Sequence, residues 1–161
     1  MAFVELLLSP LPSHVRTARL VAVAAARRAG LDDELVDELR LAVGEACSRA
    51  VALNARHAPD IPVQLTVAHD AMGLTLTVVD TGPAAGPFLD DPAEGLLAGD
   101  LDGGPDELAD PDVALAVLHG LVDDLTVTTK PGATVVTMHW PLPVGAAGPR
   151  ATIVAQRTSQ R

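Results

Sequence analysis

The sequence predicts an α+β fold, a two-layer sandwich in which a mixed, mostly antiparallel sheet carries helices on one face. Three segments repeat apolar residues at helical spacing, and five short runs are rich in β-forming residues. These elements follow one another as strand, helix, helix, hairpin, long loop, helix and hairpin. The 161 residues, 48% of them hydrophobic, provide enough apolar material for one core. We therefore expect one domain over residues 1–142 and a flexible tail over residues 143–161.

The first strand and the first helix are predicted from the N-terminal 30 residues. Phe3–Leu8 is an apolar run that stops before two prolines, as a strand does. Ser13 is the expected N-cap of the helix that follows, and Gly30 ends its apolar periodicity. No acidic residue lies between Ser13 and Gly30, so the exposed side of this helix is basic. Its cations are Arg16, Arg19, Arg27 and Arg28.

A second helix is predicted from Asp32 or Asp33 to about Arg56. One apolar stripe of this helix faces the core, and it comprises Leu35, Leu39, Ala42, Ala46, Ala50 and Leu53. A polar row runs along one edge of that stripe, where side chains meet a cleft, and it comprises Glu38, Glu45, Arg49 and Arg56. We expect the functional residues of the helix to lie in this row.

A β-hairpin and a long loop follow the second helix. Val63–Ala68 and Leu74–Val79 are β-rich runs, and residues 69–73 supply the turn between them. Residues 81–110 are rich in Gly, Pro, Asp and Ala and show no sustained periodicity. A loop of this length is typical of a functional lid or of a disordered segment.

A third helix and a closing hairpin complete the domain. Asp110 is the expected N-cap of the helix, and Pro111 is its first residue. Asp124–Thr129 and Thr134–Trp140 form the two strands of the hairpin, which turns around Gly132.

The net charge of −10 is concentrated in one stretch of the chain. Asp80 to Asp112 holds ten of the 21 acidic residues and no basic one, which leaves 11 acidic residues beside all 11 basic ones elsewhere. An acidic surface disfavours contact with phosphate backbones, so we expect no direct binding of nucleic acid. The stretch is either a recognition element that meets a basic surface or a loop that its charge keeps solvated.

The cysteine and histidine residues argue against a disulfide-linked protein and against a metal-binding protein. The single cysteine, Cys47, excludes an intramolecular disulfide framework, and the five histidines show no ligand spacing, so we expect no metal site.

The apolar stretch at the N-terminus is far shorter than the roughly 20 residues that a membrane span needs. We therefore expect a cytoplasmic protein without membrane contact.

Two short motifs outline a nucleotide site. Glu45 lies on the second helix, four residues before Arg49, and Asp80-Thr81-Gly82 leaves the second strand of the first hairpin. A carboxylate on a helix and an Asp-x-Gly at the end of a strand are the groups that an adenine pocket needs. These motifs and the order of the elements resemble the GHKL (Bergerat) ATP-binding fold, and most closely the bacterial anti-sigma factor and serine/threonine kinase family, from Phe3 to Leu142.

The resemblance assigns roles to these residues. The family motif E-x-x-x-N falls on Glu45 and Arg49, which implies that Glu45 is the general base and that arginine replaces the asparagine that would hold magnesium. The motif D-x-G-x-G falls on Asp80 to Ala84, which implies that Asp80 accepts a hydrogen bond from the adenine amino group and that Gly82 leaves room for the ring. Thr134 corresponds to the threonine of the terminal G-T-x-V element, with one residue inserted after Gly132.

The phosphate end of the resemblance departs most from the family. The motif G-x-G-L falls on Asp112-Val113-Ala114-Leu115, so both of its glycines are replaced. Asp112 adds negative charge, and Ala114 adds a methyl group, where backbone amides would cradle phosphate. Arginine cannot coordinate a metal ion, so we expect no bound metal and weak or absent binding of ATP or ADP, with little dependence on magnesium.

The resemblance implies a regulatory protein of the anti-sigma type. Its expected partners are a sigma factor, an antagonist of the STAS type and a second copy of the chain in a homodimer. The alternatives are an ATP-dependent serine/threonine kinase that phosphorylates the antagonist, with Glu45 as base, and a degenerate nucleotide sensor. Two local alternatives also stand: Glu45 and Arg49 form a helical ion pair worth ~0.3 kcal/mol with no ligand, or Arg49 binds phosphate directly.

Overall fold

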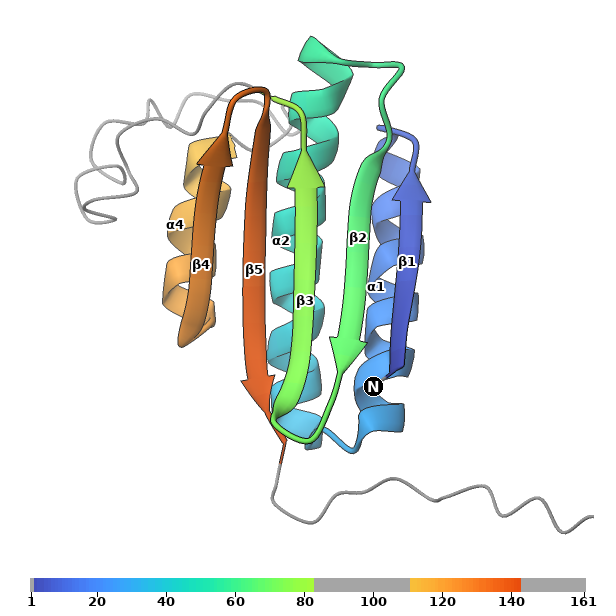
Figure 1. Cartoon of the computed structure of the whole chain (residues 1–161), viewed down its shortest axis with the longest axis vertical. Helices are drawn as coiled ribbons and strands as arrows, with labels where there is room; N and C mark the ends of the chain where they lie inside the picture. Colours follow the sequence, from blue (N-terminus) through green and yellow to red (C-terminus); the bar gives the residue numbers. More distant parts are fainter. Residues whose placement is uncertain (1, 83–110, 143–161) are drawn as a thin grey trace, which may run out of the picture.

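The computed structural model describes residues 2–82 and 111–142, which form two layers (Figure 1). One layer is a five-stranded sheet in the order β1-β2-β3-β5-β4, made of β1 (Ala2–Leu8), β2 (Val63–His69), β3 (Gly73–Asp80), β4 (Asp124–Lys130) and β5 (Ala133–Pro141). The other layer contains α1 (Pro12–Ala29), α2 (Asp33–His57) and α4 (Pro111–Leu121). The predicted α+β sandwich is confirmed. Every strand pair within the described residues is antiparallel, so the sheet is not mixed there.

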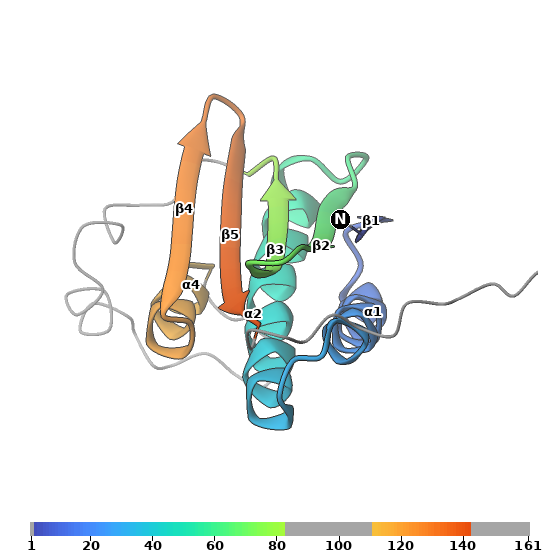
Figure 2. The same cartoon turned by 60° about the horizontal axis from the view of Figure 1, so that its bottom comes forward.

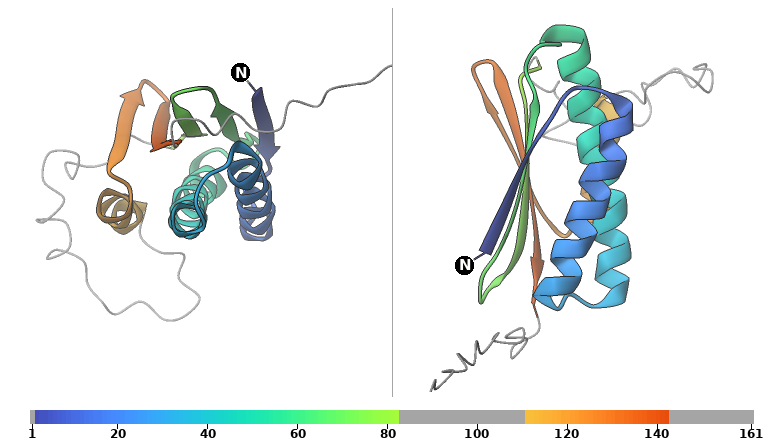
Figure 3. Two further views of the ribbon diagram at one scale, coloured as in Figure 1. Left: turned by 90° about the horizontal axis from the view of Figure 1, so that it is seen from below. Right: turned by 90° about the vertical axis from the view of Figure 1, so that its right-hand side faces the viewer.

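The three helices cover one face of the sheet (Figures 2 and 3). α2 lies in the middle of the helical layer, with α1 on the side of β1 and β2 and α4 on the side of β4. α2 is therefore the element that packs against both other helices and against the central strand β3.

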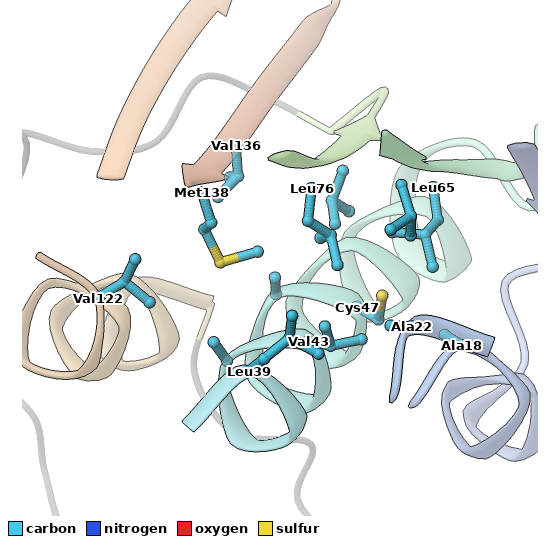
Figure 4. Packing of buried hydrophobic residues seen from close by; sticks show 14 of the residues in the cluster. Ala18, Ala22, Leu39, Val43, Cys47, Leu65, Leu76, Val122, Val136 and Met138 are labelled. Atoms are coloured by element: carbon cyan, nitrogen blue, oxygen red, sulfur yellow. The ribbon is translucent and has the colours of Figure 1, made fainter. Parts of the chain in front are cut away.

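The core lies between the sheet and this helical layer (Figure 4). Leu76 of β3 and Met138 of β5 face each other, Leu65 of β2 lies two rungs away, and all three side chains point toward the helical layer. Strand side chains alternate between the two faces, so their neighbours face away from the helices. That opposite face carries half-buried threonines at one cross-strand rung, which are Thr66, Thr77 and Thr137.

The start of α1 differs from the prediction. The helix begins at Pro12 with Leu11 as N-cap, so the prediction of Ser13 as the cap is wrong. Proline is favoured at the first helical position because its φ is already helical and its missing N–H would have no partner there. The predicted end is confirmed, because Gly30 adopts a left-handed φ of 88° and its N–H bonds to the carbonyl of Arg27.

Several predictions concern residues outside the ranges that the structure describes. The loop predicted over 81–110 is described only at Thr81 and Gly82, and the tail predicted over 143–161 is not described. The acidic residues from Asp90 to Asp110 lie in the same undescribed part. Within residues 2–82 and 111–142, no helix is long and apolar enough to cross a membrane.

Candidate functional site

A buried ion pair joins the two predicted motifs. Nη1 of Arg49, on α2, donates a hydrogen bond of 2.6 Å to Oδ2 of Asp80, the last residue of β3. The side chains are only 1% and 0% exposed, so this contact is shielded from water. The other carboxylate oxygen, Oδ1, accepts the backbone N–H of Gly82 at 3.0 Å. Both oxygens of Asp80 are therefore bonded within the protein.

The environment of Asp80 acts on its protonation in two directions. Burial raises the pKa of the Asp80 carboxyl, because the charged form loses its hydration. The charge of Arg49 and the N–H of Gly82 oppose that shift by stabilising the carboxylate. The ionised group depends on Arg49 for its stability, so removing the guanidinium would leave a buried and uncompensated charge.

The prediction that Glu45 and Arg49 form an ion pair along the helix is wrong. The partner of Arg49 is Asp80, 31 residues further along the chain, and Glu45 is half-buried one helical turn away. The attraction between two charges is stronger in the protein interior than at the surface, so Arg49 pairs with the buried carboxylate of Asp80. The alternative in which Arg49 binds phosphate directly meets the same obstacle, because its guanidinium is already held by Asp80.

Gly82 is packed against α2. A Cβ atom at this position would lie 2.8 Å from Cβ of Leu53 and 3.1 Å from Oδ1 of Asp80. The glycine therefore allows the backbone to lie directly on the helix. Leu53 and Asp80 take up the space that a side chain at this position would need.

Asn54 is a site residue that the sequence patterns missed. Its Oδ1 accepts the backbone N–H of Thr81 at 2.8 Å and the Thr81 hydroxyl at 3.2 Å, and its Nδ2 donates to the carbonyl of Ile61 at 2.9 Å. Asn54 is fully buried. The signal that could have found it is an amide in the buried part of a long helix, where a polar side chain needs partners. Asn54 and Arg49 together tie Asp80-Thr81-Gly82 to α2.

Thr134 completes a buried polar cluster. It faces Asp80 across the β3–β5 ladder and is fully buried. Its hydroxyl and Nε of Arg49 are the two buried side-chain atoms without a hydrogen-bond partner in the described part of the chain. Most buried polar groups are bonded, so these two atoms mark the least satisfied point of the interior.

The other predicted residues lie in several different environments. Asp112 to Leu115 lie in the first turns of α4, where Ala114 and Leu115 are buried. Glu38 accepts a hydrogen bond of 2.8 Å from the indole N–H of Trp140, and Arg56 is exposed. The predicted polar row of α2 therefore separates into different environments. No group of metal-ligating side chains occurs within residues 2–82 and 111–142.

Comparisons with known proteins place this geometry in context. Residues 8–140 match the family model described as the histidine kinase-like ATPase domain. The structure is similar to the crystal structure of the RsbU and RsbW domains of Rv1364c from Mycobacterium tuberculosis, with a TM-score of 0.59, 16% identity and 86% of this chain covered. The match covers 32% of that chain, so the present chain spans about a third of its length. No curated protein is significantly similar in sequence. The predicted resemblance to GHKL-type domains is confirmed.

Proposed function

The chain belongs to the family of histidine kinase-like ATPase domains, and from this premise we propose that it is an anti-sigma-type regulatory protein in which ATP binding is weakened or lost. Its partners are a sigma factor, an antagonist of the STAS type, or both. The observation that carries the proposal is the bond between Arg49 and Asp80, which engages the carboxylate that the resemblance assigns to adenine.

The strength of the Arg49–Asp80 ion pair supports weakened or lost binding of ATP. To free Asp80 for a base, a ligand would have to break a buried ion pair, and removal of one partner of such a pair costs about 3–5 kcal/mol. Since each 1.4 kcal/mol is a factor of ten in affinity, a micromolar site would weaken by roughly two to four orders of magnitude. Contacts to the phosphates would have to offset that loss, and Arg49, Asp112 and Ala114 are unsuited to magnesium-dependent contacts.

The protein-binding role also includes a homodimer. We place its contact on part of β1 or α1, because β1 is an edge strand with large apolar side chains that are exposed: Phe3 is 67% and Leu7 66% exposed. Exposed apolar surface on an edge strand is typical of a protein interface. Light scattering at micromolar concentration tests this contact, and a monomer mass that does not change with concentration would contradict it.

Affinity capture from an extract of the source cells tests the partners. The tagged chain should retain a sigma factor or a STAS-type protein, and the amount should be the same with and without magnesium-ATP. The same capture with the tag alone is the control. Recovery of neither class of protein would contradict the regulatory role, and transfer of phosphate from ATP to the captured antagonist would favour the kinase alternative.

Arg49→Asn tests whether Arg49 is the main defect of the nucleotide site. This variant restores the family residue and releases Asp80, so its affinity for magnesium-ATP should exceed that of the natural chain at least tenfold. Calorimetry measures both proteins. Arg40→Asn, in an exposed pair with Asp37 on the same helix, is the matched control and should change nothing. Equal affinities of Arg49→Asn and the natural chain would assign the defect to Asp112 and Ala114 instead.

A further inference from the structure

A hollow lies between the first strand and the first helix, away from the Arg49–Asp80 pair. Its volume is about 460 Å³, and its apolar lining comprises Phe3, Val4, Val21, Ala24, Ala25 and Val67. The right-hand view of Figure 3 shows why space exists there, because the N-terminal half of β1 runs away from α1. Two alanines of α1 line the space between the strand and the helix, and their methyl groups are too short to fill it. We call this hollow the β1–α1 groove.

The polar lining of the groove is basic. It consists of Arg28 near the end of α1 and His69 at the end of β2, and no carboxylate of residues 2–82 and 111–142 lines the groove. Arg28 makes no ion pair with any residue of the described ranges. A groove with apolar walls and two polar groups offers few hydrogen-bond partners to water, so it is better suited to a carbon chain.

We propose that the β1–α1 groove binds a free medium-chain monocarboxylate, with the alkyl chain against Val21, Ala25 and Val67 and the carboxylate on Arg28. The volume lies within the range of small-molecule sites, which is roughly 300–1,000 Å³. The charge of Arg28 determines the sign of the ligand, since a guanidinium binds a carboxylate through two parallel N–H donors. The β1–α1 groove is separate from the family's nucleotide site.

Calorimetry with a homologous series of ligands tests the alkyl chain. Hexanoate and octanoate are titrated below micellar concentrations into the full chain. Octanoate should bind with one site per chain and roughly 15-fold more tightly than hexanoate, because each buried methylene contributes about a factor of four. Absence of saturable octanoate binding at millimolar concentration would overturn the proposal.

Three variants test the site itself. Ala24→Leu fills the groove from an exposed helical position, so the fold is retained, and it should weaken octanoate at least tenfold. Arg28→Gln should weaken octanoate at least fivefold but leave the neutral octan-1-ol within twofold, because only the carboxylate uses the guanidinium. Arg16→Gln removes an exposed charge from α1 outside the lining and should change neither ligand.

Two results would contradict the assignment. Equal octanoate affinity in Ala24→Leu, Arg28→Gln and the natural chain would place the ligand elsewhere. If the natural chain binds no octanoate and Ala24→Leu halves the mass measured by light scattering, the groove holds a second copy of the chain instead. Circular dichroism of each variant verifies that the fold is retained.

Discussion

Two regions of the molecule contrast in how side chains fill the space between their elements. At the junction of α2 and β3, the two sequence motifs meet in a buried polar cluster, and Arg49 and Asp80 are bonded to each other. Between β1 and α1, apolar walls border an open groove that no side chain of the described residues fills. The contrast shows that retained motif residues need not mark an open site, and that open space can lie where no motif points.

The largest expected effect comes from breaking the ion pair on one side. Arg49→Met should lower the free energy of unfolding by about 3–5 kcal/mol, because Asp80 is left charged and buried. Urea denaturation followed by the fluorescence of Trp140, the single tryptophan, measures this change. The matched control is Arg40→Met, which breaks an exposed pair with Asp37 and should cost less than about 1 kcal/mol. Equal losses in the two variants would contradict a special role for the buried pair.

Removing both charges sharpens the same comparison. The double variant Arg49→Met with Asp80→Leu should recover most of the stability lost in Arg49→Met, because buried ion pairs are often replaced by apolar pairs without net cost. A double-mutant cycle that includes Asp80→Leu alone gives the coupling between the two positions. Losses that simply add would mean that Arg49 and Asp80 do not interact in the folded state.

A smaller loss is expected from Asn54→Ala. This variant leaves the N–H of Thr81 and the carbonyl of Ile61 without their partner, and because both bonds are only partly buried, the two losses together should cost about 1–3 kcal/mol. Hydrogen exchange should show faster exchange of the Thr81 amide than in the natural chain. Gln64→Ala, which removes an exposed hydrogen bond to Glu5, is the control and should leave that amide unchanged. Unchanged protection of Thr81 in Asn54→Ala would contradict the contact.

The smallest effect is expected at Cys47, which lies on α2 in the core. Burial raises the pKa of its thiol to about 12, so the reactive thiolate is nearly absent at pH 8. The native protein should therefore resist a thiol-specific disulfide reagent at pH 8 and react fully once urea unfolds it. Rapid reaction without denaturant would show that the helical layer opens readily.

The elements of the fold were predictable because they depend on local patterns. Apolar periodicity located α2 nearly to the residue, and Gly30 marked the end of α1. The start of α1 was misplaced because the proline preference for the first turn outweighs the capping preference of Ser13. Thr134 was selected only through the family motif, and the structure places it opposite Asp80.

The bonding within the site was not predictable, for a physical reason. Arg49 has a near neighbour in Glu45, and sequence spacing favours that local pair. Its actual partner is 31 residues away and is set by the way β3 packs on α2. Asn54 was missed for the same reason, since its partners Thr81 and Ile61 lie beyond the helix. The β1–α1 groove has no motif, because its residues come from separate elements and share only apolar character.

Titration of magnesium-ATP into the natural chain by calorimetry tests the central claim most directly. If Arg49 closes the site by holding Asp80, the dissociation constant should be weaker than about 1 mM, or no binding heat should be detected. A dissociation constant in the low micromolar range, equivalent to about 8 kcal/mol of binding free energy, would contradict the claim, because the nucleotide would then bind despite the ion pair.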